Sequence, residues 1–129
     1  MNTTNSSILG LGHDILEIDR MRKAYARHGV LLLDRLLLLE EQAYCLQFQD
    51  PIPRIAARFS AKEAIAKALG TGFGQELSFL DIEIKNNQTG KPFVELSPRA
   101  NLFFHNPKIL LSISHCKAYV STTAILVSC

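Results

Sequence analysis

The chain has few cysteines and no tryptophan, which bears on disulfides, zinc sites and the composition of the core. Cys45, Cys116 and Cys129 are the only cysteines among 129 residues, and no two of them have C-x-x-C spacing. An odd number without that spacing predicts neither a disulfide framework nor a cysteine-based zinc site, and a reducing cytoplasm is the expected compartment. Without tryptophan and with three tyrosines, the core is expected to consist mainly of Leu, Ile, Val, Ala and Phe.

No apolar stretch is long enough to span a membrane. The leucine-rich stretch 30–39 is interrupted by two charged residues and followed by two glutamates, whereas a transmembrane helix needs about 20 apolar residues. It is predicted to be a buried or interface helix. Residues 1–7 are polar and uncharged and predict no signal peptide, so we expect a flexible N-terminus followed by a single domain over 8–129.

The net charge is also small, but the charged residues are unevenly distributed along the chain. The net charge of +2 does not indicate a nucleic-acid-binding protein, and 47% hydrophobic residues exclude a disordered chain. Segment 20–28 contains Arg20, Arg22, Lys23 and Arg27 and no acidic residue. A local basic face on a nearly neutral protein suits an acidic protein partner, although an ordinary solvated helix face is the simpler alternative.

Hydrophobic patterning places helices in the first half of the chain and strands mainly in the second. The pattern predicts helices over 18–28, 31–48 and 54–69, and strands over 8–12, 80–84, 93–96, 109–114 and 119–127. The last two strands are separated by a short segment and are expected to form a hairpin. This order predicts an α+β fold with helices packed on a mainly antiparallel sheet.

The predicted helix 54–69 contains the densest group of polar residues. Glu63 and Lys67 are four residues apart and share one helix face, whereas Arg58 lies about 140° around the axis from Glu63. A Glu four residues before a Lys is typical of a stabilising surface pair. A metal-binding carboxylate beside a phosphate-binding ammonium has the same spacing, so the spacing alone leaves both interpretations open.

Three further positions could contribute to chemistry. Asp14 follows the predicted strand 8–12, where it is either a magnesium ligand or a helix cap. His115 lies at the end of another predicted strand, as a structural residue, a phosphate contact or a base. Gly70 begins the glycine-rich loop 70–74, which lacks the P-loop pattern and follows a helix; a helix-ending turn is its simpler interpretation, and close approach to a ligand is the alternative.

Four segments together resemble one family in sequence and in order. They are 10–18 (GLGHDILEI), 58–72 (RFSAKEAIAKALGTG), 90–92 (GKP) and 112–115 (SISH). The chain resembles the holo-acyl-carrier-protein synthases, the small bacterial type of 4′-phosphopantetheinyl transferase, over most of its length. The resemblance implies an α+β enzyme that uses Mg²⁺ to transfer 4′-phosphopantetheine from coenzyme A to a serine of apo acyl carrier protein. Adenosine 3′,5′-bisphosphate is the second product, and the reaction serves fatty acid biosynthesis.

The same resemblance implies roles for individual residues. The Mg²⁺ ligands are Asp14 and Glu63, the catalytic residues are Glu63 and Lys67, and the coenzyme A-binding residues are Arg58, Lys67, Gly70 and His115. Arg20, with Arg22 and Arg27 extending its face, is expected to bind the acidic carrier protein. A cytoplasmic homotrimer with active sites at subunit interfaces is implied as well. Cys116 departs from the family, which commonly has a small hydroxyl residue there.

Two other functions fit the same residues. A different magnesium-dependent phosphotransferase or hydrolase would use the same two carboxylates and would turn over a nucleotide without a carrier protein. A non-catalytic module would bind acidic proteins through residues 20–27, and its binding would survive both the removal of metal and the Glu63→Ala substitution.

Overall fold

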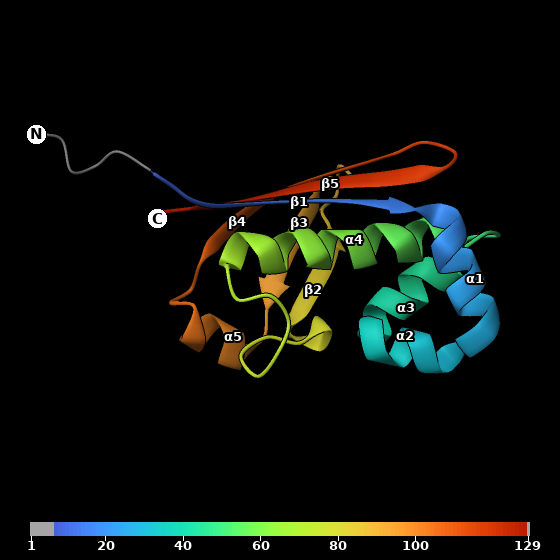
Figure 1. Cartoon of the computed structure of the whole chain (residues 1–129), viewed down its shortest axis with the longest axis horizontal. Helices are drawn as coiled ribbons and strands as arrows, with labels where there is room; N and C mark the ends of the chain where they lie inside the picture. The colour runs from blue at the N-terminus through green and yellow to red at the C-terminus, as the bar shows by residue number, and fades with distance from the viewer. Residues whose placement is uncertain (1–6, 129) are drawn as a thin grey trace, which may run out of the picture.

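The longest helix, α4 (Ile52–Leu69), lies against one face of a three-stranded antiparallel sheet. The computed structural model describes residues 7–128 (Figure 1), so the N-terminus predicted to be flexible lies outside the described residues except for Ser7. The strand order is β1-β5-β4, with the strands β1 (Ile8–Glu17), β5 (Tyr119–Val127) and β4 (Lys108–His115). No described helix has the length and apolar character that crossing a bilayer requires.

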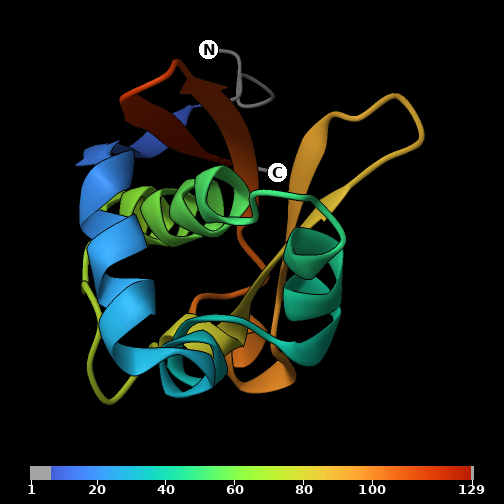
Figure 2. The same ribbon diagram turned by 90° about the vertical axis from the view of Figure 1, so that its right-hand side faces the viewer.

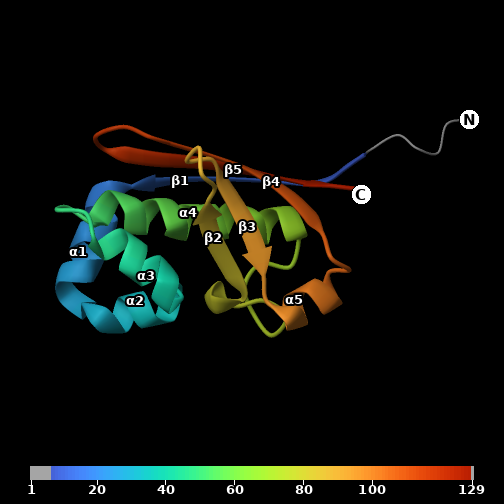
Figure 3. The same ribbon diagram turned by 180° about the vertical axis from the view of Figure 1, so that it is seen from behind.

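The remaining elements pack around α4 on the side away from this sheet. Three short helices lie at one end of α4, and a β-hairpin crosses it further along (Figures 1 and 3). These elements are α1 (Ile18–His28), α2 (Val30–Leu36), α3 (Leu39–Leu46), the 3-10 turn η1 (Phe79–Asp81), β2 (Ile82–Asn86), β3 (Pro92–Leu96) and α5 (Pro98–Phe103). The predicted α+β class and the predicted C-terminal hairpin are confirmed, since β4 and β5 pair antiparallel from His115↔Val120 onward.

Glycine allows α4 to approach β1 closely. Gly10 and Gly12 face the helix, and a Cβ atom built at either position would overlap the carbonyl oxygen of Ala68 or Ala64. The helix contributes small residues to this contact, since Ala64 and Ala68 are both buried. The two glycines therefore set the separation between β1 and α4, the two elements that supply Asp14 and Glu63.

We expect Gly12→Ala to destabilise the protein by about 3 kcal/mol, because the added methyl group meets helix backbone, which cannot rotate away. Urea unfolding monitored by circular dichroism measures this loss. Gly74→Ala is the matched control, because a Cβ there meets nothing within 4 Å and the backbone has no positive φ. Equal stability of the two variants would contradict the close-approach explanation.

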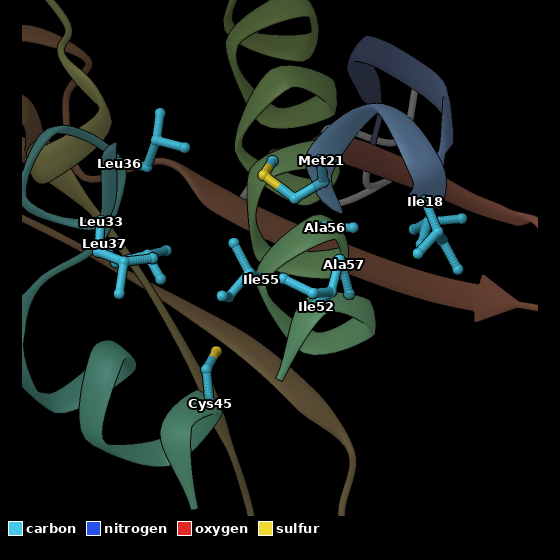
Figure 4. Packing of buried hydrophobic residues seen from close by; sticks show 11 residues of the cluster. Ile18, Met21, Leu33, Leu36, Leu37, Cys45, Ile52, Ile55, Ala56 and Ala57 are labelled. Atoms are coloured by element: carbon cyan, nitrogen blue, oxygen red, sulfur yellow. The ribbon is translucent and has the colours of Figure 1, made fainter. Parts of the chain in front are cut away.

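The hydrophobic core forms two clusters along α4. In Figure 4, Met21 of α1, Cys45 of α3 and Ile55 of α4 belong to the cluster between α4 and the short helices. The second cluster fills the space between the C-terminal half of α4 and the β2–β3 hairpin, which projects from the body in Figure 2. Burial raises the pKa of the Cys45 thiol to about 11, so this cysteine is a protonated core residue.

The prediction of one helix over 31–48 was wrong, because the chain forms α2 and α3 with an extended break between them. Leu37 has φ −130° and ψ 140°. Polar groups released by this break are satisfied by buried side chains: Lys62 Nζ donates to Leu36 O at 2.7 Å, and Leu38 N donates to Glu41 Oε1 at 2.9 Å. The break falls within four consecutive leucines, 36–39, which contain no proline, glycine or polar residue that could have revealed it.

The strand predicted over 80–84 was misplaced, and α5 was not predicted. Residues 79–81 form η1, and the strand β2 begins at Ile82. The carboxylate of Asp81, in η1, is buried and accepts hydrogen bonds from Arg99 and Ser97. Ser97 also accepts from Ala100 N at 3.2 Å, which caps the six-residue helix α5.

Candidate active site

Asp14 is held in one orientation by the buried hydroxyl group of Ser60, which in turn contacts the hydroxyl of Thr122. It lies within β1, rather than after a strand as predicted, and it pairs with Thr122 of β5. Ser60 Oγ of α4 donates to Asp14 Oδ2 at 2.7 Å and lies 3.0 Å from Thr122 Oγ1. The helix-cap interpretation is wrong, because Glu17 occupies the N-cap of α1 and makes no side-chain cap bond. Asp14 is therefore a partly buried, oriented carboxylate.

Lys67 extends toward Asp14, and Glu63 lies in the electrostatic field of both. Lys67 Nζ donates to His13 O at 2.9 Å and lies 3.4 Å from Asp14 Oδ1. Burial, with a further contribution from the negative charge of Asp14, raises the pKa of the Glu63 carboxyl, and Lys67 partly offsets this. Among the described residues Lys67 forms its ion pair with Asp14 and not with Glu63, so the surface-pair interpretation is wrong.

The two carboxylates line one cavity of about 400 Å³. Arg20 borders it, and the rest of its wall is mainly apolar, formed by Ile15, Leu16, Met21, Ala24, Leu32, Leu36 and Phe59. Within the part of the chain that the structure describes, no group of three or more His, Cys, Asp and Glu side chains could hold a metal. Two carboxylates fit Mg²⁺, which commonly takes one or two from the protein and completes its coordination with water and substrate phosphate oxygens.

Arg58 and His115 line a second cavity, of about 220 Å³, which Asn86 and Gly90 also border. Arg58 is 5% exposed, and its guanidinium donates to Asn86 Oδ1 at 2.9 Å. None of the residues that line this cavity also lines the cavity of Asp14 and Glu63. The structure thus brings these two predicted coenzyme A residues together, but on a different side of α4 from the carboxylates.

Gly70 lines neither cavity. It is the left-handed C-cap of α4, with φ 91°, and its N–H donates to the carbonyl oxygens of Ala66 and Lys67. This conformation favours glycine, so the simpler interpretation of a helix-ending turn accounts for its presence.

The three predicted docking arginines have different surroundings on α1. Arg20 borders the cavity of Asp14 and Glu63. Arg22 makes a bidentate ion pair with Asp50, at 2.9 and 3.1 Å, and Arg27 lies exposed in the last turn. Exposed ion pairs contribute little to stability because water screens them, so Arg22 can exchange Asp50 for another carboxylate.

Sequence reasoning missed two sets of functional neighbours. Ser60 lies three residues before Glu63 and seven before Lys67, so helical spacing could have placed it on the same face. Its partner Thr122 depends on strand register, which the sequence does not reveal. The pair Lys62–Glu41, with 2.7 Å between Nζ and Oε1, is completely buried behind the site and was also missed.

Comparison with known proteins shows the family of the chain. The model of the 4′-phosphopantetheinyl transferase superfamily matches residues 10–124. Holo-acyl-carrier-protein synthase of Protochlamydia amoebophila is 47% identical over 117 residues, covering 91% of this chain and 96% of that protein. That of Chlamydia pneumoniae is 48% identical over 118 residues, covering 92% and 96%.

Solved structures of the same enzymes share the fold. The holo-acyl-carrier-protein synthase of Neisseria meningitidis superposes with a TM-score of 0.88 at 31% identity, covering 93% of this chain and 98% of that one. The Helicobacter pylori enzyme in complex with coenzyme A gives 0.82 at 35% identity, covering 90% and 98%. Fold and site thus define a phosphopantetheinyl transferase, as predicted. Within that class, the chain belongs to the holo-acyl-carrier-protein synthase family.

Proposed function

We propose that the cavity of Asp14 and Glu63 is the catalytic centre at which this chain transfers 4′-phosphopantetheine from coenzyme A to a serine of apo acyl carrier protein. The observation that supports this most directly is the convergence of Asp14, Glu63 and Lys67. Asp14 Oδ2 accepts a hydrogen bond from the buried Ser60 hydroxyl, and the other oxygen of Asp14 lies 3.4 Å from Lys67 Nζ. Two carboxylates and an ammonium suit phosphoryl transfer, in which positioning and charge stabilisation dominate.

The reaction needs no nucleophile from this chain. The serine hydroxyl of the carrier protein attacks the β-phosphorus of coenzyme A, an O–P bond forms, and the bond between β-phosphorus and the bridging oxygen breaks. Adenosine 3′,5′-bisphosphate leaves with that oxygen. Lys67 places a positive charge beside the phosphates. The Glu63 carboxylate lines the cavity and can accept the serine proton.

Asp14 and Glu63 would hold Mg²⁺, with Ser60 keeping Asp14 in position. When bound, Mg²⁺ neutralises charge that develops on the phosphate oxygens. Coenzyme A completes its contacts through Arg58 and His115, and the turn at Gly70 lies next to Lys67 at the end of α4.

A homotrimer is the assembly that we propose, with the active sites between subunits. The outer face of the sheet has no helix over it (Figure 1). Leu11 of β1 and Leu110 of β4 lie opposite the same residue of β5 and are 65% and 47% exposed. Exposed apolar faces of this kind are typical of subunit interfaces. The two cavities lie on different sides of α4, which suits an active site shared between subunits. In such a site one copy supplies the cavity of Arg58 and His115, and the next copy supplies the cavity of Asp14 and Glu63.

We also propose a cytoplasmic location and a role in fatty acid biosynthesis. Both described cysteines are free thiols, with Cys45 buried and Cys116 exposed, which suits a reducing compartment.

Arg20→Glu should raise the carrier-protein KM at low salt by about tenfold, because it reverses a charge at the edge of the catalytic cavity. The kcat should change little. Lys108→Glu, an exposed charge reversal at the start of β4, is the control. An unchanged carrier-protein KM in Arg20→Glu would refute the docking assignment. Higher salt should weaken docking of the unmodified enzyme, since screening acts over about 8 Å at physiological ionic strength.

The proposed reaction is tested against the two alternatives by measuring release of adenosine 3′,5′-bisphosphate with and without apo carrier protein. Release should require the carrier protein, its serine and Mg²⁺. Release from coenzyme A alone would instead indicate a hydrolase or a different phosphotransferase. Binding of the carrier protein with no release under any condition would indicate a non-catalytic module.

A further inference from the structure

The cavity that contains Arg58 and His115 has an additional positive charge, from Arg54. Arg54 lies four residues before Arg58 on the same face of α4, and both side chains line this cavity of about 220 Å³. No Asp or Glu lines it, and none of the described ion pairs involves either arginine. Two guanidinium groups and an imidazole without a carboxylate favour a multiply charged anion.

Aromatic rings hold both guanidinium groups in place. Arg54 Cζ lies 3.9 Å from the centre of the Phe48 ring, and Arg58 Cζ lies 4.2 Å from that of Tyr44. The two rings make an edge-to-face contact with centroids 5.3 Å apart. Stacking uses the flat face of a guanidinium and leaves its N–H edges for a phosphate.

Arg58 has hydrogen-bonding capacity that the described residues do not satisfy. Its two hydrogen bonds, to Ile84 O and Asn86 Oδ1, both leave from Nη2. The side chain is 5% exposed, and its buried Nε has no partner among residues 7–128. An unsatisfied donor of this kind in a cationic cavity points to a ligand.

We propose that Arg54 is a further coenzyme A-binding residue, which binds the 3′-phosphate of the ribose together with Arg58 and His115. This inference rests on the proposed function. Coenzyme A has two anionic groups, the pyrophosphate and the 3′-phosphate monoester. The pyrophosphate reacts at Asp14, Glu63 and Lys67, so the second cationic cavity remains for the monoester. A dianionic monoester matches a pair of arginines better than a single one.

The inference is tested by titration calorimetry with adenosine 3′,5′-bisphosphate and with 5′-AMP, which lacks the 3′-phosphate. Arg54→Gln should weaken binding of the bisphosphate by about tenfold, the loss of one charge-assisted contact, and change AMP binding less than about twofold. Arg54→Lys keeps the charge but loses the planar fork, so it should show an intermediate loss. Lys108→Gln, which removes an exposed charge five residues before Ile113 on β4, should leave both affinities unchanged.

Kinetics provide the second readout. Arg54→Gln should raise the KM for coenzyme A and leave the KM for dephospho-coenzyme A and the kcat unchanged, because the 3′-phosphate lies away from the bond that breaks. Equal losses for ligands with and without the 3′-phosphate, or no loss at all, would overturn the inference. The calorimetry tests the role of Arg54 even if the enzyme transfers no phosphopantetheine. Absence of transfer by the unmodified enzyme would overturn the proposed function and not the binding inference.

Discussion

Glu63→Gln should lower kcat/KM by at least about a thousandfold, which corresponds to about 4 kcal/mol of transition-state stabilisation. The substitution keeps the size of the side chain and removes its charge. It thereby removes one of the two carboxylates that we assign to Mg²⁺, which is also the acceptor that we propose for the serine proton. Initial rates of carrier-protein modification, measured across coenzyme A concentrations, give this value. Carrier-protein binding should persist, because Arg20 and the rest of α1 are unchanged.

The same substitution should have the opposite effect on stability. The folded-state pKa of Glu63 is raised above its ordinary value, so the stability that the neutral acid contributes is present at low pH and is lost as pH rises through the folded pKa. At pH 7 the metal-free Glu63→Gln protein should therefore melt about 2–5 °C higher than the unmodified protein. Added Mg²⁺ should stabilise the unmodified protein and not the variant.

Glu40→Gln is the matched control, because Glu40 is exposed in the first turn of α3. It removes the same charge outside the cavity and should leave the rate and its metal dependence unchanged. A rate for Glu63→Gln within tenfold of the unmodified enzyme would contradict the assignment of Glu63 as a metal ligand.

The second large effect concerns stability: Lys62→Met should destabilise the fold by about 3–5 kcal/mol. Lys62 is fully buried, and its Nζ donates to Glu41 Oε1, Leu36 O and Phe79 O at 2.7, 2.7 and 3.1 Å. Its removal leaves the carboxylate of Glu41 buried without its positive partner and leaves two carbonyl oxygens without a donor. The midpoint and slope of urea unfolding measure the change.

Lys67→Met provides the comparison on the same helix. Lys67 has a half-exposed side chain, so the same substitution there should cost activity but less than about 1 kcal/mol of stability. The double variant Lys62→Met/Glu41→Gln should recover part of the loss. The Glu41→Gln substitution leaves an amide oxygen that can still accept a hydrogen bond from Leu38 N or Ile84 N, and it removes the unpaired charge. Simple addition of the single losses would show that the two residues do not act as a pair.

Local sequence was sufficient to predict those structural features that depend on residues close together in the chain. The segment 58–72 contains Arg58, Glu63 and Lys67 on an Ala-rich helix that ends at a glycine, and α4 has this form. Asp14 was predicted to follow a strand, but β1 continues past it to Glu17. The α+β class followed from the change of hydrophobic period along the chain.

Long-range contacts were beyond such reasoning. Nothing in the sequence distinguishes Lys62 from the other polar residues of its helix. Only the folded structure shows that it contacts Glu41, 21 residues earlier. The break between α2 and α3 follows from this contact, because Lys62 and Glu41 satisfy the backbone groups that the break releases. The separation of the two cavities around α4 likewise depends on strand register and hairpin position.

The proposed catalytic centre can be tested by intact-mass spectrometry of apo acyl carrier protein incubated with this enzyme, coenzyme A and Mg²⁺. We expect the mass of the carrier protein to increase by one phosphopantetheine. A chelator, Glu63→Gln, or replacement of the acceptor serine by alanine should abolish the increase. An unchanged carrier-protein mass with a range of apo carrier proteins, or an increase that persists in Glu63→Gln with chelator present, would contradict the proposed catalytic centre.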